Sequence, residues 1–350
     1  MIQQIDAKKK SKNKLPTWYH SAQIYYPPKL NVEQCSSEIT AKYKASIIDG
    51  DQIADITGGF GIDSYYFSKT FKKVHHFELN KCLSEITAHN LLVLKRNNIQ
   101  CFAEDGLKNV LKEQYDVIYA DPSRRHKDKG KVFFLKDCEP DIPFHLPALL
   151  KNCKKLLIKT SPMLDISVGL NELQSVSELH IVAVNNEVKE LLWLIIPNFK
   201  GIPHIKTINI NKDHKDVFNF HLNDAFEVDY TNPKKYLYEP NAAIMKSGAF
   251  DLIPARYQVY KLHKHSHLYT NDELISFPGR QFIINKVIPY QKKYFKEFLT
   301  IEKANISIRN FPESVAFLRK KLRIKDGGDL FLFFTTTEEN KKIIVSCTKV

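Results

Sequence analysis

Four polar signals follow four successive apolar runs of the sequence, each at the point where a strand is expected to end. They are the glycine turn that begins at Asp55, the carboxylates Glu78 and Asp105, and the pair Asp121-Pro122. Because the carboxyl ends of parallel strands meet at one edge of a sheet, these groups are expected to converge on one ligand. Glycines let a ligand approach the backbone, and carboxylates accept hydrogen bonds from hydroxyl and amino groups. The pattern predicts a nucleoside site.

Each part of this site has a predicted role. Glu78 closes the second strand and is expected to accept both ribose hydroxyls, whereas Asp105 follows the third strand and is expected to accept from the adenine amino group. Asp121 and Pro122 follow the fourth strand and are the candidate catalytic residues that present the target. The other candidate cofactor-binding residues form the turn and helix start after the first strand: Asp55, Thr57, Gly58, Gly59, Phe60, Gly61 and Asp63.

The glycine turn differs from that of dinucleotide-binding proteins. A G-x-G-x-x-G fingerprint would need a third glycine where Ser64 stands. An Asp-Pro pair after the fourth strand has no evident use in a nicotinamide enzyme, but in class I methyltransferases this loop faces the methyl group. A sulfonium donor also needs no pyrophosphate contact. S-Adenosylmethionine (SAM) is therefore the predicted cofactor, and an NAD-dependent oxidoreductase is the alternative enzyme class.

Strands alternate with helices through the segment that carries these residues. This alternation predicts an α/β fold with a mostly parallel, Rossmann-like sheet. The last two strands are too close in sequence for a helical crossover, so one of them is expected to be an antiparallel strand at the sheet edge. The predicted strands cover residues 52–56, 73–78, 100–103, 116–120, 155–159, 179–184 and 191–196.

Longer motifs extend from near the start of the chain nearly to its end. They are EQCSSE (33–38), DITGGFGID (55–63), YADPSRR (119–125), DCEPD (137–141), KTSPMLD (159–165), EPNAAI (239–244), RNFP (309–312) and KDGGD (325–329). In these motifs the chain resembles bacterial class I methyltransferases with a THUMP-like C-terminal domain. The resemblance implies a SAM-dependent methyltransferase with a small ferredoxin-like domain and an RNA-binding type of C-terminal module. It implies no particular target nucleotide.

The distribution of charge supports a polyanionic partner. The formal net charge is +13, of which residues 1–15 carry +4 and residues 236–350 carry +8, so the part between them is nearly neutral. RNA is the predicted partner. The expected domains are a basic arm with a lead-in helix (1–40), a methyltransferase domain (41–235), a ferredoxin-like domain (236–279) and a basic THUMP-like α/β domain (280–350).

The loop after the fourth strand bears on the type of reaction. Amino-group methyltransferases usually carry a proline and an aromatic residue after Asp-Pro, and here Ser123 and Arg124 stand in those places. Because an arginine can stack on a base or bind a phosphate, Arg124 and Arg125 are candidate substrate-binding residues. The alternative is that both arginines pair with the acids of the 137–141 segment.

Methylation at carbon 5 of a pyrimidine would need a nucleophilic thiolate. Cys138 is the cysteine nearest to the Asp-Pro loop, and its two acidic neighbours would raise its pKa, which disfavours a thiolate. Direct methyl transfer to a base nitrogen is therefore predicted, with Asp121 accepting charge or a proton. A non-catalytic RNA-binding protein on the same fold is the remaining alternative.

Basic side chains gather on a predicted helix over residues 312–322. Its apolar face leaves three basic residues outward, and a fourth follows the helix. The alternative is an ordinary solvated helix face. The four candidate RNA-binding residues are Arg319, Lys320, Lys321 and Arg323.

Other classes of protein are disfavoured. No apolar run is long enough to span a membrane, and the first residues lack the apolar stretch of a signal peptide. Six cysteines without a CxxC pair fit neither a disulfide framework nor a zinc site, so a cytoplasmic protein without a metal is expected. The three histidines of the 263–267 segment lack acidic or cysteine partners and favour a solvated turn. The oligomeric state does not follow from the sequence.

Overall fold

The computed structural model describes residues 2–124, 134–298 and 300–350. They form two compact units. The first consists of the chain up to Lys206 together with Asn219–Leu222, and the second of Thr207–Phe218 together with Asn223–Val350.

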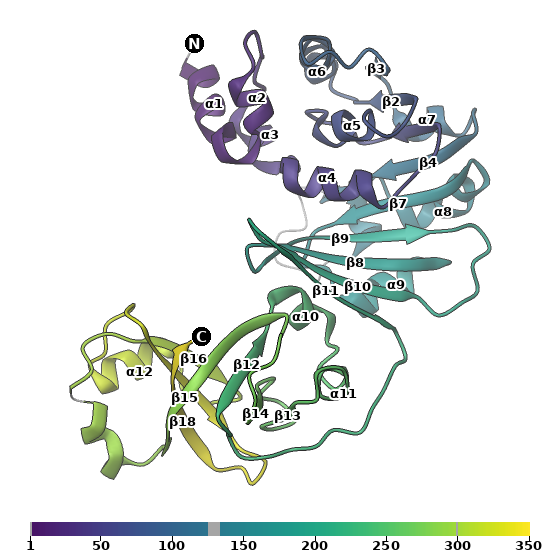
Figure 1. Ribbon diagram of the computed structural model, residues 1–350. Coiled ribbons are helices and arrows are strands. Elements are labelled where there is room, and N and C mark those ends of the chain that lie inside the picture. The colour runs from purple at the N-terminus through teal and green to yellow at the C-terminus, as the bar shows by residue number, and fades with distance from the viewer. Residues whose placement is uncertain (1, 125–133, 299) are drawn as a thin grey trace. The chain divides into compact units, whose positions relative to one another are not determined.

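The sheet of the first unit places the predicted site (Figure 1). Its strands follow the order β3-β2-β1-β4-β7-β9-β8, and the order continues with β10 and β11. Strands β1, β2, β3, β4 and β7 are parallel. Because β1 lies between β2 and β4, the strand order reverses beside it, and ligands bind at such switch points. The bounds are β1 Gln52–Asp55, β2 Lys73–Phe77, β3 Ile99–Phe102, β4 Tyr115–Ala120, β7 Cys153–Thr160, β8 Val176–Val184, β9 Glu187–Ile195, β10 His204–Ile210 and β11 Lys215–His221.

The predicted fold class is confirmed, but the antiparallel strand is not at the sheet edge. Strand β9 pairs antiparallel with both β7 and β8 and so lies inside the sheet. Asn185 and Asn186 both have positive φ, at 50° and 62°. Such a two-residue turn folds the chain directly back on itself. The hairpin therefore enters the sheet as a unit, with β9 next to β7.

The helices that follow the strands begin at side-chain caps. In each of four helices a polar side chain accepts a backbone N–H of the first turn, which supplies a partner that the helix itself lacks. These caps are Asn80 for α6 (Lys81–Val93), Asp105 for α7 (Gly106–Val110), Asp141 for α8 (Ile142–Lys151) and Asp165 for α9 (Ile166–Glu172). Helix α5 (Ile62–Phe67) instead follows Gly61, whose φ is 74°.

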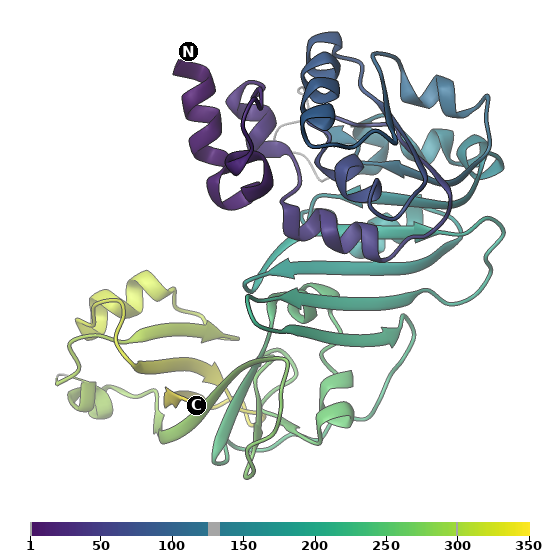
Figure 2. The same cartoon turned by 45° about the horizontal axis from the view of Figure 1, so that its top comes forward.

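Helices also precede the first strand, and Figure 2 shows them in purple beside the sheet. Helix α1 packs on α2 and α3, and α4 packs on α5. The Trp18 side chain is fully buried and contacts the rings of Phe60 and Tyr65. The segment expected to be a basic arm is therefore folded onto the unit. The bounds are α1 Ile2–Lys14, α2 Pro16–His20, α3 Lys29–Gln34 and α4 Glu38–Ser46.

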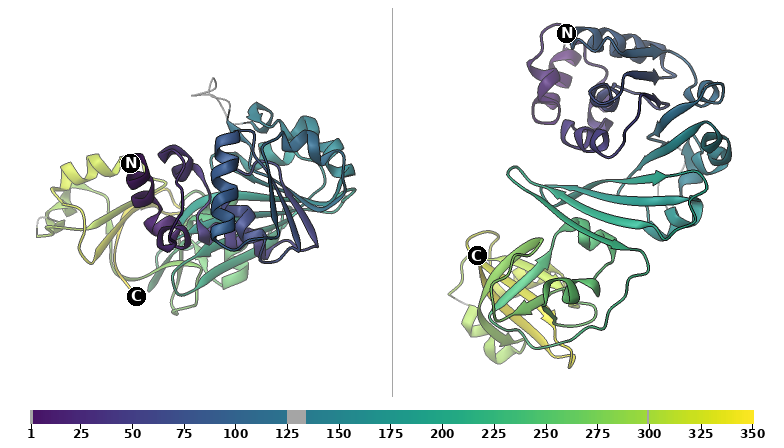
Figure 3. Two further views of the ribbon diagram at one scale, coloured as in Figure 1. Left: turned by 90° about the horizontal axis from the view of Figure 1, so that it is seen from above. Right: turned by 45° about the vertical axis from the view of Figure 1, so that its right-hand side comes forward.

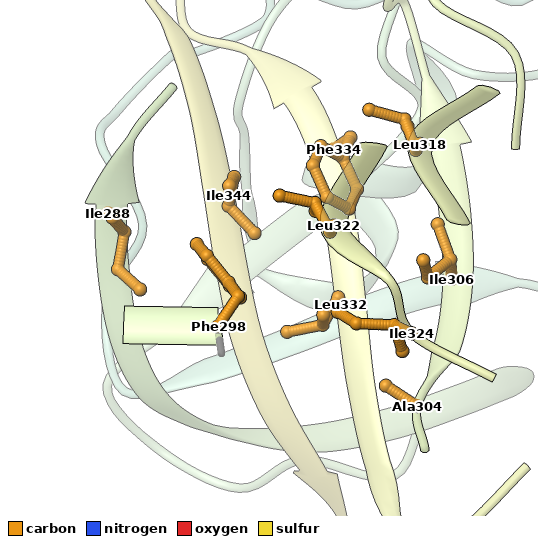
Figure 4. Packing of buried hydrophobic residues seen from close by; sticks show 10 residues of the cluster. All are labelled: Ile288, Phe298, Ala304, Ile306, Leu318, Leu322, Ile324, Leu332, Phe334 and Ile344. Atoms are coloured by element: carbon orange, nitrogen blue, oxygen red, sulfur yellow. The ribbon is translucent and has the colours of Figure 1, made fainter. Parts of the chain in front are cut away.

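Within the described residues, the second unit is built on a mixed sheet of seven strands, drawn in green and yellow in Figure 3. Its order is β13-β14-β12-β15-β18-β17-β16. An apolar cluster, labelled in Figure 4, packs the sheet against α12 (Val315–Leu322) and includes Leu318 and Leu322 from this helix. The other bounds are β12 Tyr236–Pro240, α10 Ala242–Ser247, α11 Leu252–Tyr257, β13 Tyr260–Lys261, β14 Tyr269–Asn271, β15 Gly279–Pro289, β16 Asn305–Arg309, β17 Leu330–Thr336 and β18 Lys342–Lys349.

Candidate cofactor and substrate sites

A cavity of about 430 Å³ lies at the carboxyl ends of β1, β2 and β4. The predicted site residues that line it are Thr57, Gly58, Gly59, Phe60, Gly61, Asp63, Glu78 and Asp121. The wall also includes residues of the folded N-terminal segment and of the 139–140 segment: Asn31, Gln34, Cys35, Ser36, Glu139 and Pro140. Asp55, Asp105 and Pro122 are not among the lining residues.

The turn after β1 needs glycine at two positions for different reasons. A Cβ on Gly58 would lie 2.1 Å from Cε1 of His76, whose ring fills that space. Gly61 has a φ of 74°, and a Cβ there would lie 2.5 Å from Cγ2 of Thr87. Together they keep the turn flat against the sheet, with its backbone at the cavity wall.

Glu78 holds the same turn from the neighbouring strand. Its Oε2 accepts the N–H of Gly59 at 2.9 Å, and its Oε1 accepts the N–H of Asn80 at 2.7 Å. Each carboxylate oxygen has a second lone pair. The carboxylate is therefore fixed at the cavity wall with capacity for two further donors, such as the hydroxyls of a ribose.

Asp55 lies beneath the turn instead of lining the cavity. Its carboxylate is 1% exposed, accepts the hydroxyl of Ser64 at 2.7 Å and accepts the N–H of Thr57 at 3.2 Å. Burial raises the pKa of Asp55 to about 7. The Ser64 hydroxyl also lies 3.0 Å from Nδ1 of His76, and burial lowers the pKa of this histidine to about 4. Asp55 thus supports the turn from within.

Asp105 caps a helix in this structure. It accepts the N–H of Lys108 at 3.3 Å and lies 3.6 Å from the ammonium group of the same lysine. The helix start beside it packs tightly on β1, because a Cβ on Gly106 would lie 2.7 Å from Cα of Ile56. The adenine contact expected for Asp105 stays a prediction.

Asp121 is held in place by two partners. Its N–H donates to the hydroxyl of Thr57 at 2.7 Å, and its Oδ2 pairs with the ammonium group of Lys159. Burial alone would lower the pKa of Lys159, but the carboxylates of Asp121, Glu190 and Asp63 together raise it. The sequence pattern marks Lys159 only as the first residue of the 159–165 motif, and its position at the end of β7 was the available signal for this role.

A buried set of charges lies behind the cavity. The ammonium group of Lys44 is fully buried, 2.8 Å from Oε2 of Glu190 and 3.2 Å from Oδ1 of Asp63. Asp63 also accepts the hydroxyls of Ser36 at 2.7 Å and Tyr119 at 3.0 Å. Sequence reasoning predicted only Asp63 of this set. The others come from positions far apart in the chain, and no local pattern marks them.

The predicted substrate loop is described only in part. Pro122 is buried, and β5 (Ser123–Arg124) pairs antiparallel with β6 (Cys138–Glu139). The side chain of Arg124 and the whole of Arg125 lie outside the described residues. Cys138 is fully buried.

The basic residues around α12 divide into two pairs. Arg319 pairs with Asp326, and Lys321 pairs with Glu313 at 3.1 Å. Lys320 and Arg323 are exposed and have no acidic partner among the described residues. A binding role for the four residues stays a prediction, and only half of them present an unpaired charge.

The histidine segment was expected to be a solvated turn, and this is wrong for His263. His263 is 7% exposed, and its Nδ1 accepts the N–H of His265 at 3.0 Å. Its Nδ1 also lies 2.9 Å from the amide nitrogen of Asn310. In the described part of the chain no cluster of three His, Cys, Asp or Glu side chains has a metal-binding arrangement. No helix of that part has the length and apolar character to cross a membrane.

Comparison with known proteins supplies the family. Residues 236–278 match a ferredoxin-like domain family, and residues 279–349 match a THUMP domain-like family. A crystal structure described as a "putative methyltransferase from Porphyromonas gingivalis W83" is 34% identical in sequence with a TM-score of 0.91, and the match covers 99% of this chain and 89% of that one. The chain belongs to this methyltransferase family. No curated protein matches the methyltransferase chain.

Two further solved structures align with part of this methyltransferase. An rRNA methylase from Streptococcus thermophilus is 17% identical over 45% of this chain and 94% of its own, with a TM-score of 0.33. A methyltransferase from Streptococcus mutans, also described as "putative" and solved in complex with SAH, is 16% identical over 45% of this chain and 96% of its own, with a TM-score of 0.33. At these TM-scores neither adds to the argument.

Proposed function

We propose that this methyltransferase uses SAM to methylate a base nitrogen in RNA, in tRNA or rRNA. The observation that carries the proposal is the cavity beside β1, where a glycine turn and four carboxylates meet. Family membership favours methyl transfer over the NAD-dependent oxidoreductase considered above.

The residues of the cavity suit SAM. Glu78 has free acceptor capacity for a ribose, and the turn around Gly59 allows a ligand to approach the backbone. Asp63 and Asp121 supply negative charge, which favours a cationic sulfonium centre. When bound, SAM would supply an electrophilic methyl group.

Asp121 is the residue that we assign to the target. The Lys159 ammonium group pairs with Oδ2, and Oδ1 has no partner among the described residues. An ionised carboxylate only accepts hydrogen bonds. Asp121 therefore suits a target that presents an N–H, such as an exocyclic amine, and can take up the proton released when the nitrogen is methylated.

Two features of the C-terminal part of the chain support RNA as the substrate: its positive net charge and its match to a THUMP-like family. Residues 236–350 carry a net charge of +8, and most of this segment matches a THUMP-like family. A basic surface attracts the phosphate backbone without regard to sequence.

Transfer of tritium from methyl-labelled SAM to RNA tests the proposal directly. The parent protein and Asp121→Ala are incubated with RNA from a strain that lacks the gene, and the nucleosides are then separated by mass spectrometry. We expect one methylated nucleoside with the parent and none with the variant. Equal labelling by both proteins would exclude the role of Asp121, and SAM binding without any labelling would favour a non-catalytic protein.

A further inference from the structure

A second and larger cavity lies entirely within the second unit. Its volume is about 790 Å³. The ferredoxin-like segment contributes one side and the THUMP-like segment the other. The residues that line it are His263, Lys264, His265, Ile308, Asn310, Phe311, Pro312, Thr336, Asn340 and Lys342.

The side chains that line this cavity are all cationic or neutral, and none is acidic. It has no carboxylate among its lining residues, while Lys264 and Lys342 are both exposed. Neither lysine forms an ion pair with an acidic residue in the described part of the chain. On α12, by contrast, Arg319 and Lys321 are each paired with an acid. A concave surface with only cations concentrates positive potential and favours an anionic ligand.

The polar floor of the cavity is rigid. Asn310 has a φ of 51°, and its carbonyl accepts the hydroxyl of Thr336 at 2.7 Å. Its amide nitrogen lies 2.9 Å from Nδ1 of His263, which also accepts the N–H of His265. Because a backbone N–H always donates, the contact with His265 shows that Nδ1 carries no proton and acts as an acceptor. The Asn310 amide therefore donates inward, and its Oδ1 has no partner among the described residues.

An aromatic wall stands next to this floor. The ring of Phe311 is half-buried and packs edge-on against Tyr290, with centroids 4.9 Å apart, and against Phe334 at 5.5 Å. These contacts fix the orientation of the ring, while its remaining surface faces the cavity. Proteins bind single-stranded RNA with this combination of aromatic faces, amide groups and cations.

A buried carboxylate anchors the backbone that presents these groups. Glu239 is 3% exposed and accepts from Arg280 at 2.6 Å and from Arg309 at 2.5 Å. Arg309 directly precedes Asn310 and Phe311. Thus one carboxylate of the ferredoxin-like segment fixes the THUMP-like strand end that forms the cavity.

We propose that this cavity binds one phosphorylated nucleotide of the RNA substrate. Lys264 and Lys342 would contact the phosphate, Phe311 would stack on the base, and Oδ1 of Asn310 would accept from the base edge. The inference rests on the proposed function for the choice of RNA. It moves the main RNA contact of this unit from α12 to the cavity.

Two double variants of the full-length protein compare the cavity with α12. One is Lys264→Ala with Lys342→Ala, and its matched control is Lys320→Ala with Arg323→Ala, which removes the same charge outside the cavity. Affinity for a 5′-phosphorylated single-stranded RNA is measured by fluorescence anisotropy at several salt concentrations. We expect the cavity variant to bind at least about tenfold more weakly, with a log–log salt slope smaller by about 1.4 for two lost contacts. If the control variant loses as much RNA affinity as the cavity variant, the proposal is wrong.

Phe311→Leu tests the stacking contact separately. Leucine keeps most of the apolar volume but removes the aromatic face, so we expect affinity to fall about fivefold or more while the salt slope stays the same. The melting temperature is measured for each variant. Unchanged RNA affinity in a normally folded Phe311→Leu protein would contradict the assigned stacking.

Binding of a free nucleotide tests this inference separately from the proposed function. Binding of a nucleoside 5′-monophosphate is measured by equilibrium dialysis with SAM in excess, and inorganic phosphate serves as the comparison probe. We expect the parent to bind the nucleotide more tightly than phosphate and the cavity variant to lose this preference. If this preference is absent although RNA is methylated, only the cavity assignment fails. If nucleotide binding holds but no RNA is methylated, only the proposed function fails.

Discussion

The two cavities differ in how their charges are compensated. Around the first, Lys44 is fully buried, Lys159 is partly buried, and each contacts at least one carboxylate. Around the second, Lys264 and Lys342 are exposed and contact no carboxylate of the described residues. Charges that are paired and shielded from water keep fixed positions. A reaction at a single atom requires such fixed positions. Unpaired, exposed charges keep their field for a polyanion. The first cavity therefore suits catalysis, and the second suits RNA binding.

The largest effect is expected from removing a buried cation. Lys44→Ala would leave Glu190 and Asp63 buried without their counter-charge, which costs about 3–5 kcal/mol of unfolding free energy. Urea unfolding measures this cost. Lys42→Ala, two residues away and exposed, is the matched control and should change stability by under about 0.5 kcal/mol. Equal stabilities for the two variants would remove the contrast between the cavities.

The next effect concerns the proposed reaction. Asp121→Ala should lower kcat for RNA methylation by about 10²–10⁴-fold, the range for loss of a general base. Lys159→Met should also lower kcat, because the ammonium group that holds Oδ2 of Asp121 would be lost. Single-turnover kinetics measure both. If kcat of Lys159→Met equals that of the parent, this ion pair is structural only.

Cofactor affinity is expected to change more moderately. Glu78→Ala should weaken SAM binding by about 1.5–3 kcal/mol, the range for hydrogen bonds to a charged group. Asp105→Ala should cost less, because an adenine amino group offers it one donor and its present contacts are with its own helix. Calorimetry on both variants measures the difference. If Asp105→Ala weakened SAM binding more than Glu78→Ala does, the assignment of ribose to Glu78 and adenine to Asp105 would be reversed.

The last prediction concerns pH and the buried acid beneath the turn. The pKa of Asp55 is about 7 in the folded protein and near 3.8 when unfolded, so its stabilising contribution is present below pH 4 and is lost as the pH rises to 7. Asp55→Asn resembles the protonated form. Relative to the parent it should therefore gain stability progressively from pH 4 to pH 7 and keep that gain above pH 7. A difference between the two proteins that does not vary with pH would show that Asp55 stays ionised throughout.

Local sequence was sufficient for the fold class and for most residues of the first cavity. Strand ends, glycines and helix caps follow from patterns within a few residues, and the rule for parallel sheets then brings Thr57, Glu78 and Asp121 together. The same local rules could not tell whether a carboxylate lines a cavity or supports a turn. Asp55 and Asp105 illustrate this, since both have short-range partners that satisfy them away from the lining.

Only the tertiary structure determined the charge pairs and the second cavity. Lys44 and Glu190 are separated by 146 residues, and Glu239 and Arg309 by 70, so no periodicity or spacing connects them. Whether a lysine is buried with a carboxylate or exposed beside an aromatic ring depends on which strands pack together. Lys44 and Lys264 look alike in the sequence. Their environments differ because burial and pairing are properties of the packed chain and not of its local pattern.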